Sequence, residues 1–413
     1  MVQKFETRNG LRIILEKIPT VRSVSIGIWI GTGSRFESKE VNGISHFIEH
    51  MFFKGTHTRS AQEIAEAFDG IGGQVNAFTS KEYTCYYAKV LDEHAEIAID
   101  VLSDMFFNSV FEEKELEKEK NVVLEEIKMY EDAPDDIVHD LLAQASYGGH
   151  ALGLPILGTQ ETLKSFTNQT LRGYMEDEYT AEKVVVSVAG NVDESFIEKV
   201  ESIFKDVKKN EQARQFTTPN FLANKLVRKK KTEQAHLCLG FNGLQIGADD
   251  IYSLVILNNI LGGSMSSRLF QEVREKKGLA YSVFSYHSSF HDSGMLTVYS
   301  GTAPNQLDEL YETMMETLNS MKDIGITEKE LNKGKEQLKG NLMLSLESTN
   351  SRMSRNGKNE LLLKRHRSLD EIILEINNVT MASTNKLSRD ILSKPYSLAL
   401  ISPNGDLPKG IKA

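Results

Sequence analysis

The sequence has few cysteines and no long apolar run. Its two cysteines, Cys85 and Cys238, lie in different halves of the chain and form no Cys-X-X-Cys pair. This excludes a disulfide framework and a cysteine-rich metal site, and we expect both thiols to be reduced and buried as small apolar groups. No apolar run approaches the roughly 18 residues that a membrane-spanning helix needs.

Basic charge is also scarce. The chain has 48 Lys and Arg residues against 58 Asp and Glu residues, for a net charge of −10. This balance argues against nucleic acid as a partner, and it suits cationic peptides. The first 19 residues have no long apolar core and no small-residue cleavage site, and are typical of two strands around the Asn9–Gly10 turn. We therefore expect a cytoplasmic protein that binds no membrane.

The chain does have the length for two hydrophobic cores. Its 413 residues predict two domains of about 200 residues each. The 40% hydrophobic and 26% charged content is ordinary for a globular protein. A polar segment without apolar periodicity predicts a linker at 208–223, between a first domain at 1–207 and a second at 224–413.

The pattern of the first half predicts strands interleaved with amphipathic helices. Alternating or β-branched runs indicate strands near 12–18, 23–31, 72–80 and 82–90. Capping and apolar periodicity indicate helices near 61–68, 93–108 and 112–130, and Pro134 suits the first turn of another helix.

A weak internal repeat links the two halves. The segment EEKELEKEKNVVLEEI at 112–127 resembles TEKELNKGKEQLKGNL at 327–342, about 215 residues later, and Glu119 then aligns with Gly334. This predicts an α+β fold of two homologous domains related by duplication, each a mostly antiparallel sheet with helices packed on one face. Two similar surface helices rich in Lys and Glu are the alternative. In the repeat alignment the second half has no carboxylate at the position of Glu119. We therefore expect the catalytic residues to lie in the first half of the chain.

The stretch SHFIEHMFFKGT at 45–56 carries His46, Glu49 and His50. Residues four apart stack on one face of a helix, so the two imidazoles can reach the same ion, with Glu49 beside them. A catalytic zinc takes three protein ligands and keeps one open position. Two histidines on an ordinary amphipathic helix remain the alternative.

A third ligand is available in the charged stretch that follows. Glu119 and Glu126 are seven residues apart, which is two helical turns, and the apolar residues Val122, Val123 and Ile127 would bury this helix. A buried carboxylate needs a partner such as a cation, and Glu119 could orient a histidine. Runs of Glu and Lys are usually solvated helix faces, so the residues alone leave both interpretations open.

The HxxEH order is the inverted form of the zincin HExxH motif. With it, nearly the whole chain resembles the pitrilysin/insulinase/mitochondrial-processing-peptidase family of zinc peptidases, and its length resembles the short two-domain branch. That family has a ligand glutamate about 76 residues after the second histidine and another glutamate seven residues before it. The resemblance implies one Zn²⁺ per chain held by His46, His50 and Glu126, with Glu49 as general base and Glu119 as the residue that orients a histidine.

The resemblance extends to a substrate strand. GGQVNAFTSKEYTCYY at 72–87 resembles the family's active-site edge strand, to which an extended peptide adds as one more strand. It implies that Asn76, Ala77 and Phe78 bind substrate. An ordinary sheet strand would show the same alternation.

Two further residue pairs take roles from the resemblance. Arg274 precedes Tyr281 by seven residues, the spacing at which the family's arginine holds substrate carbonyls and its tyrosine supports the oxyanion. On residues alone, these two are a surface charge and a strand aromatic. Asp136 and Asp140 lie where processing peptidases receive an arginine near the cleavage site, although any helix N-terminus favours acidic residues.

The resemblance thus implies a zinc metalloendopeptidase in which Glu49 activates a water at the metal. Its substrates would be peptides and unfolded polypeptide segments, with a preference for basic residues near the cleavage site. The implied assembly is a homodimer with a closed chamber, in which Arg274 and Tyr281 of one chain serve the zinc site of the other. A specific precursor-processing peptidase is a narrower alternative, and a catalytically silent structural subunit is the non-enzymatic one.

Overall fold

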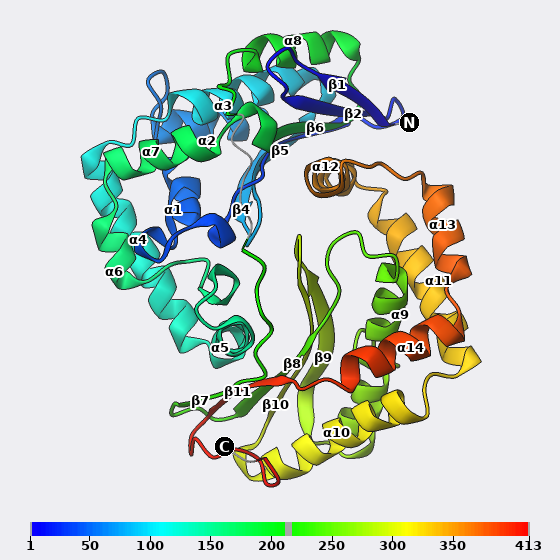
Figure 1. Ribbon diagram of the computed structural model, residues 1–413. Helices are drawn as coiled ribbons and strands as arrows, with labels where there is room; N and C mark the ends of the chain where they lie inside the picture. The colour runs from blue at the N-terminus through cyan, green and yellow to red at the C-terminus, as the bar shows by residue number, and fades with distance from the viewer. Residues whose placement is uncertain (1, 211–216, 412–413) are drawn as a thin grey trace. The chain divides into compact units, whose positions relative to one another are not determined.

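The computed structural model describes residues 2–210 and 217–411, which form two compact units (Figure 1). Each unit is assembled from three segments of the chain. Of the predicted linker 208–223, residues 211–216 lie outside the described residues. The predicted domain boundaries themselves stay a prediction. Unit 1 comprises Met1–Lys128, Leu154–Phe216 and Leu344–His366, and unit 2 comprises Met129–Gly153, Thr217–Met343 and Arg367–Ala413.

Unit 1 is built on a mixed but mostly antiparallel sheet. Its described strands run in the order β1-β2-β6-β3-β5-β4, with only β2 and β6 parallel. The strands are β1 (Val2–Glu6), β2 (Arg12–Lys17), β3 (Ser23–Ile30), β4 (Gln74–Thr79), β5 (Thr84–Leu91) and β6 (Val184–Gly190). The helices are α1 (Ile44–Met51), α2 (Ala61–Asp69), α3 (Ala95–Asn108), α4 (Glu113–Asp132, up to Lys128 in this unit), α6 (Gln160–Ser165), α7 (Asn168–Glu178), α8 (Glu194–Phe204) and α12 (Thr349–Lys358).

Both faces of this sheet are buried, because its central strands are apolar on both sides. On β3, Val24, Ile26 and Ile28 join the main core beneath α1 and α3, while Trp29 points to the other face. That second face is covered by α12, which the second half of the chain supplies. Met353 on α12 is fully buried there, and its sulfur accepts the indole N–H of Trp29 at 3.3 Å.

Unit 2 has a second sheet of the same kind. Its described strands run in the order β7-β11-β8-β10-β9, with only β7 and β11 parallel. The strands are β7 (Lys225–Lys229), β8 (Ala235–Asn242), β9 (Ala280–Ser289), β10 (Gly294–Thr302) and β11 (Ser397–Ser402). The helices are α5 (Pro134–Tyr147), α9 (Ile251–Leu261), α10 (Leu307–Asp323), α11 (Glu328–Ser345, up to Met343 in this unit), α13 (Leu369–Asn378) and α14 (Met381–Leu392).

The two sheets confirm the predicted duplication. The order β7-β11-β8-β10-β9 matches β2-β6-β3-β5-β4 strand for strand, and the parallel pair occupies the same place in both. The repeat helices α4 and α11 bury equivalent leucines, Leu116 and Leu331. At the next buried position unit 1 has Glu119, whereas unit 2 has Gly334, where an added Cβ would lie 3.0 Å from a methyl group of Ile256. Unit 2 therefore has no room for the equivalent carboxylate.

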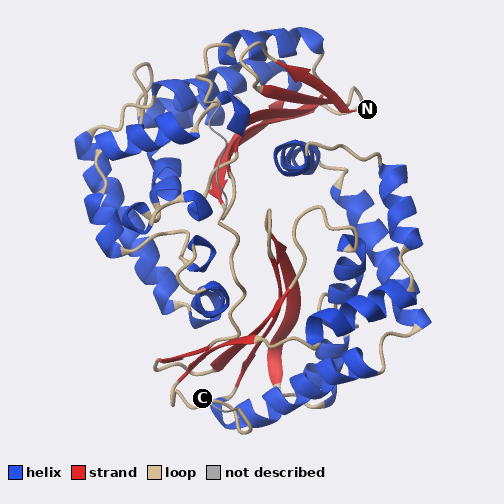
Figure 2. Cartoon of the chain, in the orientation of Figure 1, coloured by secondary structure: helices blue, strands red, loops and turns tan. Residues whose placement is uncertain are grey.

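The second face of the unit 2 sheet is likewise covered by a helix from the other half of the chain. Val138 and Leu142 on α5 pack against Cys238, Met295 and other inward residues of this face. Figure 2 shows the strands of each unit as a single layer with helices around it. The sequence predicted helices on one face of each sheet. In each unit one further helix, α12 or α5, covers the opposite face.

Both cysteines are buried free thiols, as predicted. Within the part of the chain that the structure describes, no helix combines the length and the apolar character needed to cross a membrane.

Candidate metal centre

Helix α1, which carries the HxxEH motif, is held at its N-terminus by a buried carboxylate. Glu37 accepts hydrogen bonds from the backbone N–H of Gly43 at 2.7 Å and of Ser45 at 2.9 Å. These are N–H groups that a helix start leaves without an internal partner. Burial raises the pKa of Glu37, although the same hydrogen bonds oppose the rise. Because Phe47 and Met51 anchor the helix in the core, the face with the two histidines is fixed in direction.

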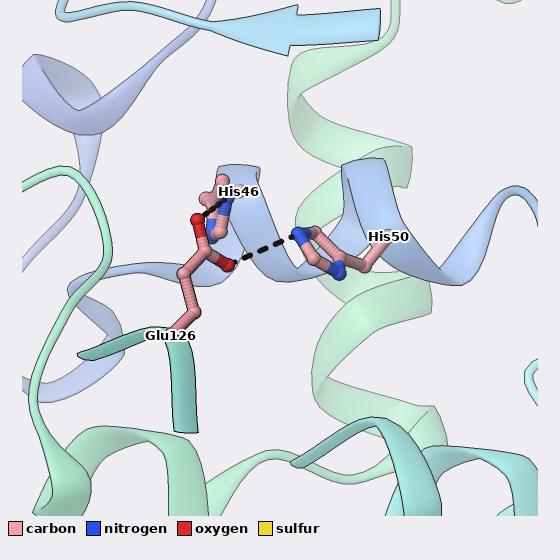
Figure 3. Close-up of side chains that lie close together, drawn as sticks. All are labelled: His46, His50 and Glu126. Carbon is pink, nitrogen blue, oxygen red and sulfur yellow. Dashed lines mark ion pairs between the residues drawn. The ribbon is translucent and has the colours of Figure 1, made fainter. Parts of the chain in front are cut away.

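The carboxylate of Glu126 faces both histidines (Figure 3). Its Oε1 lies 3.8 Å from His46 Nε2, and its Oε2 lies 3.5 Å from His50 Nε2. One ligand atom from each residue lies within 4.8 Å of the others. Among the described residues, this is the one group of three or more His, Cys, Asp or Glu side chains close enough to hold a metal ion.

The donor set and its spacing fit zinc. Zinc bonds of about 2.0–2.1 Å in a tetrahedral arrangement place the ligand atoms roughly 3.4 Å apart. The two histidine–glutamate distances of 3.8 and 3.5 Å are close to that value. Burial, and then the neighbouring His50, lower the pKa of His46 to about 3, so its imidazole is neutral as a metal ligand must be. Two nitrogens and one carboxylate leave a fourth position for water or substrate.

Glu119 contacts His50 at Nδ1, the ring nitrogen that does not face Glu126. Its buried carboxylate lies 2.8 Å from His50 Nδ1 and 2.7 Å from the ammonium of Lys54. Burial tends to raise the pKa of Glu119, but hydrogen bonds from His50 and Lys54 outweigh it and lower that pKa. The contact with Nδ1 is one that an orienting residue would make, and the role of Glu119 stays a prediction. Lys54 was missed, although its position four residues after His50 offered a signal.

Glu49 lies beside the metal ligands and is held by the neighbouring sheet. Its Oε2 accepts a hydrogen bond from the hydroxyl of Thr79, the last residue of β4, at 2.5 Å. Burial raises the pKa of Glu49, and the hydrogen bond from Thr79 partly opposes that rise. A raised pKa makes a carboxylate a stronger general base. No pattern in the sequence indicated the contact with Thr79.

Strand β4 is at the edge of the described unit 1 sheet and pairs with β5. Ala77 packs against the core on the side of α1, whereas the ring of Phe78 packs edge-on against Trp29 on the opposite face. Asn76 is exposed, and its Oδ1 accepts the backbone N–H of Ala77 at 2.8 Å. The three predicted substrate residues therefore share one edge, but their side chains divide between its two faces.

Arg274 and Tyr281 lie together in unit 2. Arg274 belongs to a π-helical segment, Phe270–Lys276, and its guanidinium carbon lies 4.6 Å from the ring centre of Tyr281. The same guanidinium carbon lies 4.8 Å from the ring centre of Phe270. Tyr281 is 80% exposed, so its hydroxyl is accessible. Phe270 was missed from sequence, although its position four residues before Arg274 places it one turn away.

Asp136 and Asp140 lie in the first turns of α5. Asp136 is exposed and Asp140 is half-buried. The carbonyl of Asp136 accepts the Tyr130 hydroxyl at 3.3 Å. Burial raises the pKa of Tyr130, and the charges of Asp140 and Asp136 raise it further. His139 was also missed from sequence; its Nδ1 lies 2.8 Å from the hydroxyl of Tyr286.

Sequence comparisons place this geometry among known peptidases. Residues 12–160 match the family described as "Insulinase (Peptidase family M16)", and residues 165–338 match "Peptidase M16 inactive domain". The chain is 66% identical over 408 residues to the "Uncharacterized zinc protease YmxG" of Bacillus subtilis, covering 99% of this chain and 100% of that protein. It is 42% identical over 415 residues to a protein of Streptomyces coelicolor also named a zinc protease, covering 98% and 90% of the two chains.

Two solved structures share the fold. A protease from Helicobacter pylori superposes with a TM-score of 0.91 at 21% identity, covering 98% of this chain and 99% of that one. A protein from Pseudomonas fluorescens described as a peptidase M16 inactive domain superposes with a TM-score of 0.92 at 19% identity, over the whole of both chains. At these identities the likeness concerns the fold.

Proposed function

Because this chain belongs to peptidase family M16, the insulinase family, we propose that it is a zinc-dependent endopeptidase acting on peptides and unfolded polypeptide segments. The observation that carries the proposal is the convergence of His46, His50 and Glu126 within 4.8 Å, with Glu49 beside them. A silent structural subunit would have no need for this set of groups.

In this mechanism some residues of the chain bind the metal and Glu49 transfers the proton. Zinc held by His46, His50 and Glu126 would supply a Lewis acid that acidifies water and polarises the scissile carbonyl. Glu49 removes a proton from the attacking water as the water oxygen bonds to the carbonyl carbon. The protonated Glu49 then gives that proton to the departing amide nitrogen as the C–N bond breaks, which leaves a carboxylate and an amine.

The edge of β4 supports an extended substrate. An open strand edge offers main-chain N–H and C=O groups to a peptide without selecting much of its sequence. Asn76, Ala77 and Phe78 lie along this edge, and helix α1 packs against β4. A peptide added here would run beside Glu49.

Arg274 and Tyr281 supply donors for substrate carbonyls. Their stacked arrangement, 4.6 Å from guanidinium carbon to ring centre, presents the guanidinium N–H groups and a phenol together. We propose that they act in a homodimer, where the pair of one chain serves the zinc site of the other. A closed dimeric chamber would admit peptides and unfolded segments and exclude folded proteins.

Asp136 and Asp140 would favour basic residues near the cleavage site. A carboxylate pairs with an arginine side chain through charge-assisted, often bidentate, hydrogen bonds. The exposed position of Asp136, and its place one helical turn from Asp140 on α5, support this preference.

Metal content and peptide cleavage test the proposal together. The wild-type protein should bind one zinc per chain and lose peptide cleavage when a chelator removes it. Glu126→Gln should lose both zinc and cleavage, whereas Glu49→Gln should keep zinc and lose nearly all turnover. The neighbouring Glu125, whose side chain is 72% exposed, gives a matched control in Glu125→Gln. Absence of any chelator-sensitive cleavage from a zinc-loaded protein would instead support the silent structural subunit.

A further inference from the structure

The side chain of Thr79 links β4, the proposed substrate-binding edge, to Glu49, the proposed base. Thr79 is the last residue of β4, and its hydroxyl donates to Glu49 Oε2 at 2.5 Å. The bond crosses from the sheet to helix α1, which packs against β4. It engages one carboxylate oxygen of Glu49 and leaves Oε1 to meet a water molecule.

The backbone of the same residue faces the open edge. At the turn between β4 and β5, the N–H of Ser80 donates to the carbonyl of Tyr83 at 2.8 Å, and the N–H of Tyr83 donates to the hydroxyl of Ser80 at 3.2 Å, so these two residues occupy the position of a hydrogen-bonded pair through one backbone bond. In an antiparallel ladder such pairs alternate with non-bonded pairs. Thr79 and its opposite residue Thr84 are therefore a non-bonded pair, and the N–H and C=O of Thr79 point away from β5.

The contact at Ala77 agrees with this alternation. Ala77 lies two residues before Thr79, so its N–H also points to the open edge. That N–H is taken by the side-chain oxygen of Asn76 rather than by β5. The carbonyl of Ala77 and the N–H and C=O of Thr79 thus form the row that an added peptide strand would meet, while Asn76 covers the N–H of Ala77.

We propose, on the basis of the peptidase function above, that Thr79 is a positioning residue that sets the register between the bound peptide and Glu49. Its backbone pairs with the peptide, and its hydroxyl holds the carboxylate that must reach the attacking water. A strand register is fixed in steps of one residue, and each step exchanges the two faces. Only the face shared by Ala77 and Thr79 is turned toward α1, so the next residue, Phe78, cannot replace Thr79 in this contact.

Removing the hydroxyl without changing shape tests this role. Thr79→Val keeps the β-branched side chain and the backbone and loses the donor. We expect kcat to fall about 10-fold to 100-fold, the range seen when a partner that orients an active-site group is removed. The KM for a peptide should change less than about threefold, because the backbone edge is intact. Thr79→Ser, which keeps a hydroxyl, should restore kcat to within about threefold.

Thr84→Val is the matched control. Thr84 lies opposite Thr79, and its hydroxyl donates to the carbonyl of Thr32 at 3.0 Å instead of to Glu49. This variant should lower the melting temperature and leave kcat within about threefold of wild type. A melting temperature and circular dichroism spectrum for each variant establish that it is folded.

Zinc and peptide binding provide readouts that do not depend on turnover. Thr79→Val should hold zinc as tightly as wild type in competition with a chelator. In a Glu49→Gln background, it should also leave the dissociation constant of a peptide within about threefold. A wild-type kcat for Thr79→Val, or an equal loss for Thr79→Ser, would overturn the inference. A tenfold loss of zinc affinity would overturn it too, since Thr79 would then act on the ligands.

Different variants test the peptidase function and the role of Thr79, so one can fail without the other. If Glu49→Gln keeps its turnover, Glu49 is not the base and the peptidase mechanism is wrong. If Glu49→Gln is inactive while Thr79→Val is fully active, the mechanism survives and only the role of Thr79 is lost.

Discussion

His50 Nδ1 lies 2.8 Å from Glu119 Oε1, while the other ring nitrogen, Nε2, lies 3.5 Å from Glu126 Oε2. An ionised carboxylate can only accept a hydrogen bond, so Nδ1 carries the proton and donates to Glu119. The lone pair of Nε2 is then directed toward His46 and Glu126. One glutamate thus selects the tautomer that lets His50 bind a metal alongside the other.

Glu119→Gln should therefore weaken zinc binding. Loss of the charge removes the constraint on the His50 tautomer, and we expect at least about a 10-fold drop in zinc affinity, measured by competition with a chelator. Glu117, on the same helix, has a side chain that is 60% exposed and pairs with Lys120, so Glu117→Gln should keep wild-type affinity. Equal affinities for wild type and Glu119→Gln would contradict the orienting role.

Mixing two inactive variants tests the shared active site. Glu49→Gln lacks the base and Arg274→Ala lacks the substrate-orienting guanidinium, so neither homodimer should cleave peptides. If the Arg274–Tyr281 pair acts on the zinc site of the other chain, each mixed dimer has one working site. An equal mixture should recover about one quarter of the wild-type activity, because half of the dimers are mixed. No recovery, with mixed dimers demonstrated by differential tagging, would reject the arrangement.

Replacing both Asp136 and Asp140 with Asn should change substrate preference. Loss of the charge-assisted bonds should raise KM about 10-fold for peptides with arginine near the cleavage site and leave KM for neutral peptides unchanged. Asp132, which lies 3.4 Å from the ammonium of Lys230, provides the control Asp132→Asn. An equal rise in KM for both kinds of peptide would remove the basis for the basic-residue preference.

The free energy of unfolding should depend on Glu360 at acid pH. Burial opposes the charge of Glu360, but hydrogen bonds from His366 and Lys4 and the charge of Arg12 outweigh it and lower its pKa to about 2. Since the folded pKa lies below the unfolded value of about 4.3, this stabilisation is fully present above pH 5 and is lost as the pH falls toward 2.

Comparison of wild type with Glu360→Gln isolates this contribution. We expect a difference in unfolding free energy on the order of 3 kcal/mol at pH 7, shrinking steadily below pH 4.5, from denaturant titrations at several pH values. Glu336 has a side chain that is 75% exposed, so Glu336→Gln should differ little from wild type at any pH. A difference for Glu360→Gln that stays constant between pH 6 and pH 3 would show that its charge is not the cause.

The second half of the chain should stabilise unit 1 through α12. Met353 is fully buried against Trp29, so Met353→Ala should lower the unfolding free energy by about 2–5 kcal/mol. Met343 is 47% exposed, and Met343→Ala should cost less than about 1 kcal/mol. Similar melting temperatures for both variants would argue against α12 as part of this core.

The sequence alone predicted most of the strands and helices in the first half of the chain. Apolar alternation predicted β2 to β5, and the helix predicted near 61–68 is α2, which Ser60 caps with reciprocal bonds to Glu63. The motif pointed to His46 and His50, and the resemblance to a peptidase family, rather than any local pattern, implied Glu126; the three lie together in the structure. The repeat register also holds, since Leu116 and Leu331 are both buried. These features depend on periods of two or 3.6 residues and on fixed spacings, which a linear pattern records.

The sequence by itself determined which residues can carry the chemistry and which faces of the helices are apolar. Only the tertiary structure decided where those faces pack. Helices α5 and α12 each cover a sheet built mainly from the other half of the chain, because an apolar stripe requires burial without specifying its partner. The contact between Thr79 and Glu49 likewise joins residues 30 positions apart, and it exists only because β4 packs beside α1.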